Sequence, residues 1–325
     1  MNCLAPEFLH KQKNALVDPH GRYITKLRLS LLDACNMRCL YCMPENPTFN
    51  HASTFASAEE LLAIAKNLCW LGIKEVRITG GEPLIRKEFR QIAQGLCQLP
   101  FEKVALTTNA AYLKEHLDFF EEIGLSHINI SLDSLNPANF KKMTRSGNFE
   151  ATLKATTEAI ERGFKVKINT VVMRGMNDHE LFDFINFSQS HAVEVRFLEL
   201  MKVGVMADRF DEYFVSTDEL LQKICERMGV VEIPVSKDST SLRFQLDNGA
   251  KIGFIASESK PFCGGCSRLR LGPKGELRPC LFAETGPSLR GVAVEQYPEI
   301  LKGTIALKPI TRPHSTGDGM FQIGG

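Results

Sequence analysis

The sequence predicts an α/β fold, an incomplete (β/α)6 TIM-like barrel followed by a smaller C-terminal α+β domain. Six short apolar runs alternate with amphipathic stretches over the first two-thirds of the chain, and this alternation predicts a parallel sheet with right-handed crossovers. The chain contains no Gly-x-Gly-x-x-Gly turn, which argues against a dinucleotide-binding sheet. Because a closed barrel of this type has eight strands, six predict an incomplete one.

The expected strands and helices follow one another between residues 26 and 200. The strands are Lys26–Leu31, Glu75–Thr79, Lys103–Thr107, His127–Ser131, Lys165–Val172 and Val193–Leu200. The helices between them are Ala58–Leu71, Glu88–Gln98, Tyr112–Ile123, Phe149–Arg162 and Asp178–Ser190. Ser57 with Glu60 predicts a capping box for the first helix, and Asn136-Pro137 predicts a helix that begins with proline at its first position.

The pattern changes after Met201, and we predict one domain over residues 1–212 and a second over residues 213–325. The second is expected to contain a helix and three short strands, Thr217–Met228, Val230–Val235, Ser241–Leu246 and Lys251–Ile255. Arg268-Leu269-Arg270-Leu271 precedes a Gly-Pro-Lys-Gly run, which predicts a strand, a turn and a returning strand. Such a hairpin would bring Cys280 back beside Cys263 and Cys266.

Cysteines are the most informative residues, because six of the ten fall into two tight groups. The groups are Cys35, Cys39 and Cys42, then Cys263, Cys266 and Cys280. Thiolates select Fe–S clusters, zinc or Cu(I) over hard cations, and structural zinc usually takes four ligands. Three thiolates on a four-iron cubane would leave one iron able to bind a small molecule. The spacing favours a cluster, with zinc or buried cysteines as the alternatives.

Composition and charge exclude several classes of protein. With 325 residues and a net charge of +1, the chain gives no global case for nucleic acid or a membrane surface as a partner. No apolar run approaches the roughly 18 residues of a membrane span, and the first twenty residues lack a signal-peptide core. Clustered cysteines in cytosolic proteins more often indicate metal binding or catalysis than disulfides. We therefore expect a cytoplasmic protein.

Polar residues gather where the predicted strands end, which is the active-site edge of a β/α barrel. Thr79-Gly80-Gly81-Glu82-Pro83 follows the second strand. The glycines allow close approach of the backbone, and Glu82 can pair with an ammonium group. A ligand like an amino acid, chelating the open iron through its amine and carboxylate, would fit there; a plain surface turn is the alternative.

Basic residues recur in or beside the strands, several with apolar neighbours on both sides. They are Arg28, Arg77, Lys167, Arg196, Arg268, Arg270 and Arg278. Charges that face inward need partners, and guanidinium groups suit phosphate or carboxylate oxygens. We predict a polyanionic substrate; ordinary exposed strand residues are the alternative. The sequence has no P-loop, serine elbow or His-Glu-x-x-His helix, so the chemistry is expected to come from cofactors.

The cysteine loop after the first strand, with Gly-Gly-Glu-Pro after the second, resembles the radical S-adenosylmethionine (SAM) superfamily. Within it, the run from Phe262-Cys263 to Cys280-Leu281-Phe282 and the Gly324-Gly325 end are similar to the GTP 3′,8-cyclase family of molybdenum cofactor biosynthesis. The resemblance extends from about Arg22 to the last residue. At Ala110 the family usually has glycine, so we expect alanine to adopt there a backbone conformation that glycine accepts more readily.

The resemblance implies two [4Fe–4S] clusters, one on each cysteine group, each with one open iron. The first open iron would bind SAM, and the second would face the guanine base of GTP. The residues implied around SAM are Tyr41, Gly81, Glu82, Ser131 and Met201. Those implied around GTP are Arg28, Arg77, Thr108, Lys167, Arg196, Arg268, Leu269 and Arg270. Gly324 and Gly325 would form a catalytic tail that threads into the barrel.

The implied activity is conversion of GTP to (8S)-3′,8-cyclo-7,8-dihydroguanosine 5′-triphosphate. A 5′-deoxyadenosyl radical would take the ribose 3′ hydrogen, and the C3′ radical would add to guanine C8. An external one-electron donor and a cyclic pyranopterin monophosphate synthase that receives the product are the implied partners. A radical SAM enzyme that modifies peptides or proteins is the alternative activity, and an Fe–S scaffold or electron carrier is the alternative class. The oligomeric state stays open, with a homodimer as one option.

Overall fold

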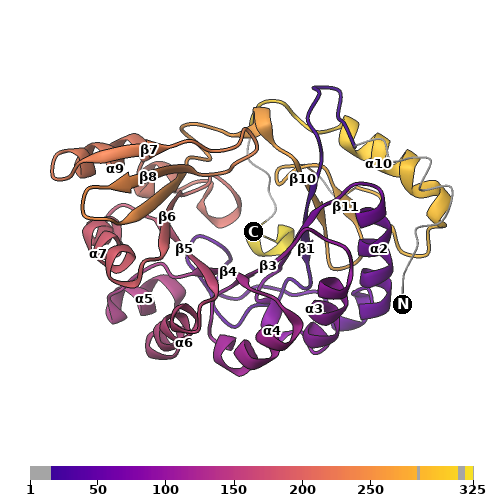
Figure 1. Ribbon diagram of the computed structural model, residues 1–325, viewed down its shortest axis with the longest axis horizontal. Coiled ribbons are helices and arrows are strands. Elements are labelled where there is room, and N and C mark those ends of the chain that lie inside the picture. The colour runs from indigo at the N-terminus through magenta and orange to yellow at the C-terminus, as the bar shows by residue number, and fades with distance from the viewer. Residues whose placement is uncertain (1–15, 284–285, 314–318, 325) are drawn as a thin grey trace.

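One curved sheet organises the computed structural model, which describes residues 16–283, 286–313 and 319–324. Within those residues the sheet has eleven strands in the order β11-β10-β1-β2-β3-β4-β5-β6-β9-β8-β7. The strands from β10 to β9 in that order are mutually parallel, and β11, β8 and β7 are antiparallel to their neighbours. Figure 1 shows the sheet as an arc with the first helices along its outer side.

The predicted incomplete barrel is confirmed by six parallel strands with helices between them in the first part of the chain. The strands are β1 (Lys26–Ser30), β2 (Glu75–Thr79), β3 (Lys103–Thr108), β4 (His127–Ser131), β5 (Lys165–Val172) and β6 (Glu194–Glu199). The helices between these strands are α2 (Ala58–Trp70), α3 (Phe89–Gln98), α4 (Leu117–Ile123), α5 (Pro137–Thr144), α6 (Phe149–Glu161) and α7 (Leu181–His191), and both α5 and α6 lie between β4 and β5.

Local signals in the sequence explain where several helices begin. Ser57 and Glu60 form the predicted capping box at α2, and Asn136 accepts hydrogen bonds from two backbone N–H groups at the start of α5, which has proline at its first position. Two helices start later than predicted, because 3-10 turns at Leu113–His116 and Asp178–Glu180 precede α4 and α7.

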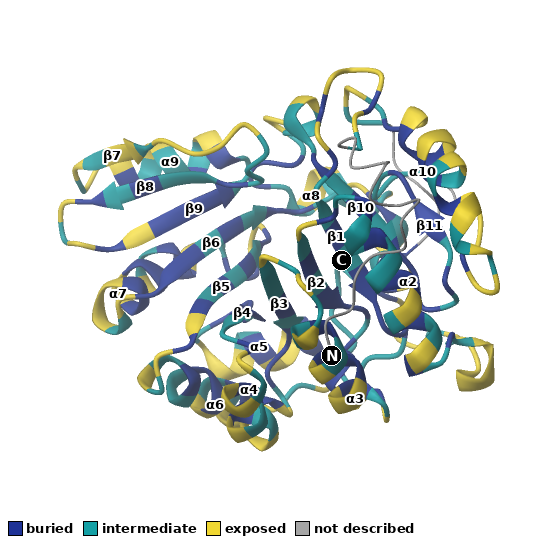
Figure 2. Ribbon diagram, turned by 45° about the vertical axis from the view of Figure 1, so that its right-hand side comes forward, coloured by how far each residue is buried: buried dark blue, intermediate teal, exposed yellow. Residues whose placement is uncertain are grey.

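The sheet has an apolar outer face and a polar inner face. Leu27, Val76 and Leu269 lie in register on neighbouring strands and are almost completely buried in the core beneath the helices. Because side chains alternate along a strand, the next residue of each strand faces the inside of the arc. Figure 2 shows buried residues along the strands and exposed ones on the outer helices.

The C-terminal part of the chain extends both ends of the same sheet. Helices α8 (Phe210–Tyr213) and α9 (Thr217–Cys225) precede β7 (Val230–Ile233), β8 (Leu242–Leu246) and β9 (Lys251–Ile255). The predicted hairpin is present as β10 (Arg268–Leu271) and β11 (Leu277–Arg278), beside β1. The domain boundary at residues 212 and 213 stays a prediction, since strands from both sides of it share one sheet.

Two further helices complete the described chain. Helix α10 (Tyr297–Ala306) lies near the β11 end of the sheet, and α11 (Met320–Ile323) lies in the middle of the arc, where Figure 1 marks the C-terminus. Among the described residues, no helix is both long enough and apolar enough to cross a membrane.

Candidate active site

The concave side of the sheet contains a cavity of about 340 Å³. All six clustered cysteines line it, so the fold brings the two groups to one site. Most other predicted site residues also line the cavity, namely Arg28, Tyr41, Arg77, Gly81, Glu82, Thr108, Ser131, Arg196, Met201, Arg268 and Arg270. Lys167, Leu269 and Gly324 are not part of its lining, and Gly325 lies outside the described residues.

The first cysteine group lies on the loop after β1, and the end of α5 holds this loop in place. The backbone N–H groups of Arg38 and Leu40 donate to the carbonyl oxygens of Thr144 and Met143, at 3.0 and 2.9 Å. The Arg38 guanidinium donates to the Cys35 carbonyl oxygen at 2.5 Å. Backbone carbonyl groups of α5 and the Arg38 side chain therefore fix the shape of this loop.

The environment of this group fits a positively charged iron centre. Burial raises the pKa of the Cys35 thiol to about 11 and that of Cys42 to about 12, and it raises the pKa of Cys39 well above its ordinary value. Three thiolates there need a cation to compensate their charge. Within the described residues, no three His, Cys, Asp or Glu side chains are arranged to hold a single metal ion; in a cubane each thiolate binds a different iron.

The Gly80-Gly81 step packs against the first cysteine loop. Gly81 donates its N–H to the Leu32 carbonyl oxygen at 2.8 Å, and a Cβ atom at Gly81 would lie 2.1 Å from the carbonyl oxygen of Ala34. Only glycine permits this approach of two backbone segments. The geometry thus shows a close approach between two backbone segments of the protein, and the predicted approach of these glycines to a ligand stays a prediction.

We expect Gly81→Ala to destabilise the metal-free protein by roughly 1–3 kcal/mol, because backbone atoms of Ala34 would have to move away. Gly303→Ala is the matched control, since a Cβ at Gly303 in α10 meets no atom within 4 Å and alanine favours a helix. Urea unfolding of the three proteins checks this. Equal unfolding midpoints for the parent and Gly81→Ala would contradict the close approach.

Glu82 is buried at the same strand end, and protein groups already occupy its carboxylate. It accepts hydrogen bonds from the N–H groups of Leu84 (3.1 Å) and Asn109 (2.7 Å) and from the hydroxyl of Thr108 (2.8 Å). Burial raises the pKa of Glu82 to about 7, although these donors oppose the shift. In this structure Thr108 therefore supports Glu82, and the predicted contacts of both with ligands stay predictions.

The turn after Asn109 has the backbone conformation expected from its departure from the family. Ala110 has a φ of 60°, in the left-handed region that glycine adopts more readily than alanine. Its N–H donates to the Thr108 hydroxyl at 3.0 Å. This hydrogen bond within the turn stabilises the strained conformation of Ala110.

Asp133 is a site residue that the sequence predictions missed. The Tyr41 hydroxyl donates to one of its carboxylate oxygens at 2.8 Å, and the Val171 N–H donates to the other at 3.0 Å. Burial raises the pKa of Asp133 to about 6. Its position two residues after Ser131 at the end of β4 was the available signal. Asp133 fixes the orientation of Tyr41 beside the first cysteine group.

Three arginines form a row across the inner face of the sheet. Arg28 on β1 lies in register with Arg77 on β2 and with Arg270 on β10. Burial and the neighbouring guanidinium groups hold the pKa of Arg28 well below its ordinary value, and burial lowers those of Arg77 and Arg270 to about 10. Like charges directly opposite one another destabilise a sheet. This arginine row (Arg28, Arg77 and Arg270) is therefore suited to a bound anion.

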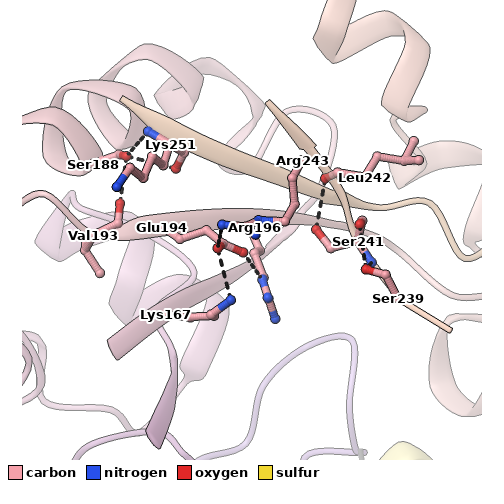
Figure 3. Close-up of polar contacts among 10 residues, drawn as sticks. All are labelled: Lys167, Ser188, Val193, Glu194, Arg196, Ser239, Ser241, Leu242, Arg243 and Lys251. Atoms are coloured by element: carbon pink, nitrogen blue, oxygen red, sulfur yellow. Dashed lines mark hydrogen bonds and ion pairs between the residues drawn. The ribbon is translucent and has the colours of Figure 1, made fainter. Parts of the chain in front are cut away.

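A second basic group surrounds Glu194, which the sequence predictions also missed. Its carboxylate accepts from Arg196 Nε at 2.6 Å and from Lys167 Nζ at 3.0 Å, and it lies 2.9 Å from a guanidinium nitrogen of Arg243. Figure 3 shows Glu194 between these three side chains. Lys167 therefore points to Glu194, which explains why it does not line the cavity.

The second cysteine group occupies the loop before β10 and the segment after β11. Burial opposes ionisation of Cys266, yet Arg268 and Lys308 together lower the pKa of its thiol to about 6. Arg268 lies over the Phe262 ring at 4.9 Å. Leu269 points away from this site, because its side chain is fully buried in the core; a backbone contact with substrate stays a prediction.

We expect Cys266 to be the first of these cysteines to react with iodoacetamide in the metal-free protein at pH 7. A thiol with a pKa of about 6 is mostly thiolate at that pH, whereas Cys35 and Cys42 stay protonated. Thiolate is the reactive form, and after allowing for its weaker nucleophilicity the rate advantage is roughly 100-fold. Quenched alkylation with peptide mass spectrometry measures the order. Earlier labelling of Cys35 or Cys42 would contradict the described charges.

The C-terminal tail reaches the arginine row. Arg270 donates to the carbonyl oxygen of Gly324, and a Cβ atom at Gly324 would lie 2.8 Å from the Ser30 side chain. Gly324 also has a positive φ of 77°, which glycine adopts without strain. Gly324 thus lies inside the arc, as expected for this part of the tail, and the catalytic role of Gly324 and Gly325 stays a prediction.

Comparisons with known proteins agree with this arrangement of fold and cysteines. A domain of the Radical SAM superfamily matches residues 29–188, and a domain described as Molybdenum Cofactor Synthesis C matches residues 193–313. Streptococcus suis SuiB, solved with bound S-adenosylmethionine, has the same fold with a TM-score of 0.61 at 16% identity, over 89% of this chain and 69% of that one. The class is a radical SAM protein, which implies a [4Fe–4S] cluster and SAM as cofactors.

Relatives of higher identity narrow this class. The GTP 3′,8-cyclase of a Synechocystis species is 42% identical over 99% of this chain and 98% of its own length. That of Petrotoga mobilis is 39% identical over 95% of this chain and 100% of its own. The GTP 3′,8-cyclase of Aquifex aeolicus is 39% identical over 85% of this chain and 87% of its own length. The chain belongs to the GTP 3′,8-cyclase family.

Proposed function

We propose that this chain converts GTP to (8S)-3′,8-cyclo-7,8-dihydroguanosine 5′-triphosphate in the first step of molybdenum cofactor biosynthesis. Family membership supports the reaction, and the arginine row is the observation in the structure that supports the substrate. Three guanidinium groups in register and partly unpaired, including the buried Nε of Arg28, suit the oxygens of a triphosphate. The same cavity is lined by two groups of three cysteines.

We assign the cofactor contacts as follows. Cys35, Cys39 and Cys42 would hold the first [4Fe–4S] cluster, and Cys263, Cys266 and Cys280 a second one. When bound, the first cluster and SAM supply the radical chemistry that removes the ribose 3′ hydrogen. Around SAM we place the residues of the first cysteine loop and the adjoining strand ends, Tyr41, Gly81, Glu82, Ser131 and Met201.

The residues of the chain would bind and orient GTP between the two clusters. Arg28, Arg77 and Arg270 would bind phosphate oxygens, with Arg268 and Arg196 beside them on the cavity wall. Lys167 is held by Glu194 at 3.0 Å and would reach the substrate only by leaving that carboxylate. The Gly324 carbonyl, bound to Arg270, would place the tail against the substrate.

We also propose the setting in which the protein works. We place the protein in the cytoplasm, where clustered cysteines more often bind metal than form disulfides. An external one-electron donor would reduce the first cluster, and a cyclic pyranopterin monophosphate synthase would take up the product.

Anaerobic reconstitution tests the proposed function. The reduced protein is given SAM with or without GTP, and 5′-deoxyadenosine and cyclised GTP are measured by chromatography with mass spectrometry. We expect 5′-deoxyadenosine to depend on GTP and to appear with the cyclised product. Formation of 5′-deoxyadenosine at the same rate with and without GTP would refute GTP as the substrate and favour peptide modification. A fully loaded protein that forms none would refute the radical activity.

A further inference from the structure

Lys308 is a buried lysine beside the second cysteine group. Its exposed fraction is 2%, although it follows the end of a surface helix, α10. Its ammonium nitrogen donates to the carbonyl oxygens of Arg268 (2.7 Å) and Pro279 (2.8 Å) and to the sulfur of Cys266 (3.5 Å). A protonated lysine has three N–H donors, so these three acceptors use all of them.

The three acceptors belong to chain segments that must come together around the second cysteine group. Cys266 lies at the end of the loop before β10, Arg268 is the first residue of β10, and Pro279 immediately precedes Cys280. Lys308 thus joins the Cys266 segment to the Cys280 segment through one nitrogen atom.

Arg22 joins the remaining cysteine to the same unit. Its guanidinium donates to the carbonyl oxygen of Cys263 at 2.6 Å and to that of Lys308 at 3.1 Å. Asp18 holds the Nε atom of Arg22 at 2.6 Å. Two buried cations, Arg22 and Lys308, therefore link all three cysteine segments, and Lys308 is the one that touches a sulfur atom.

We propose that Lys308 is a positioning residue for the second cluster, holding the segments of Cys266 and Cys280 at the spacing of the cluster and donating a hydrogen bond to the Cys266 sulfur. The inference rests on the second cluster of the proposed function. A buried charge is costly unless it is paired, and a cluster held by thiolates is the negatively charged group that Lys308 would face. Partners of metal ligands fix ligand orientation, and hydrogen bonds to the sulfurs help set the reduction potential of a cluster.

The test isolates the second cluster by removing the first. In a Cys35→Ala, Cys39→Ala, Cys42→Ala background, the parent is compared with Lys308→Met, which keeps the length of the side chain and removes its donors. Lys302→Met is the matched control, since Lys302 is an exposed lysine of α10. The readouts are iron and sulfide per chain, the rate of iron loss to a chelator, and the reduction potential from titration monitored by electron paramagnetic resonance.

We expect the parent and Lys302→Met to bind about four irons per chain, the content of one cubane. Lys308→Met is expected to bind the cluster roughly 10–100-fold more weakly, the usual effect of losing a partner of a metal ligand. Its remaining cluster should have a more negative reduction potential, because loss of a cation and a donor disfavours the added electron. A lysine that only satisfied two carbonyl groups would leave the potential unchanged.

Three results would overturn the inference. Iron retention and potential equal to those of the parent would show that Lys308 does not act on the cluster. In the reciprocal Cys263→Ala, Cys266→Ala, Cys280→Ala background, Lys308→Met should load the first cluster as its parent does; equal losses at both groups would make Lys308 a residue of general stability. A parent without iron at the second group would refute the proposed second cluster, and this inference with it.

Discussion

Cys39→Ala is expected to abolish formation of 5′-deoxyadenosine by the reconstituted, reduced protein. Cys39 is the middle thiol of the first group, and it lines the cavity. Two remaining thiolates would hold a cubane poorly. The rate should fall by at least about 10⁶-fold, the lower end of enzymatic rate enhancements, and hence below detection.

Cys69→Ala is the matched control for this prediction. Cys69 is a half-buried thiol on α2, away from the cavity lining, and its variant should keep the iron content and the activity of the parent. Iron analysis and 5′-deoxyadenosine assays of the three proteins measure the effect. If Cys39→Ala turned over SAM like the parent, the first cysteine group could not be the site of the catalytic cluster.

The βα units were predictable because their signals are local. Apolar residues alternate with polar or charged ones along β2, β4 and most of β5, and these strands have the predicted bounds. The capping box of Ser57 and the proline of α5 act within a few residues. The sequence predictions did not place β10 beside β1 or β9 beside β6, because such pairings join residues far apart in the chain and no local pattern specifies them.

The same distinction applies to the site. The cysteines and arginines were predictable because few other residue types bind iron or polyanions. The cysteines also lie close together in the chain, and the arginines recur in or beside the strands. Asp133, Glu194 and Lys308 were missed because single acids and lysines are common, and their meaning depends on partners that only the tertiary structure supplies. Lys308 lies 42 positions from Cys266 in the chain, so no motif connects the two residues.

Arg28→Met is expected to stabilise the ligand-free protein while weakening its binding of GTP. In the arginine row, Arg28 lies directly opposite Arg77 on one side and Arg270 on the other. Removing the central charge relieves two repulsive pairs, each worth up to about 1 kcal/mol, and methionine can fill the space of the alkyl stem. The variant should therefore unfold at a higher urea concentration than the parent.

The same substitution removes a charged donor from the proposed phosphate site. A hydrogen bond to a charged group contributes about 1.5–3 kcal/mol, so the dissociation constant for GTP should rise roughly 10–150-fold. Opposite changes in stability and affinity are expected where a site keeps unfavourable charges for its ligand. Equilibrium binding of GTP to the cluster-loaded protein and urea unfolding of the ligand-free protein measure the two effects.

Arg86→Met provides the contrast that makes the sign of the stability change informative. Arg86 is also buried, but it donates to the carbonyl oxygens of Leu31 and Ala56, at 2.6 and 2.5 Å. Its loss leaves those buried acceptors without this donor and should destabilise the protein by about 1–3 kcal/mol. If Arg28→Met destabilised the protein as much as Arg86→Met, the row would be a satisfied structural element. Under the proposed function, the repulsion within the arginine row is retained because the bound substrate neutralises it.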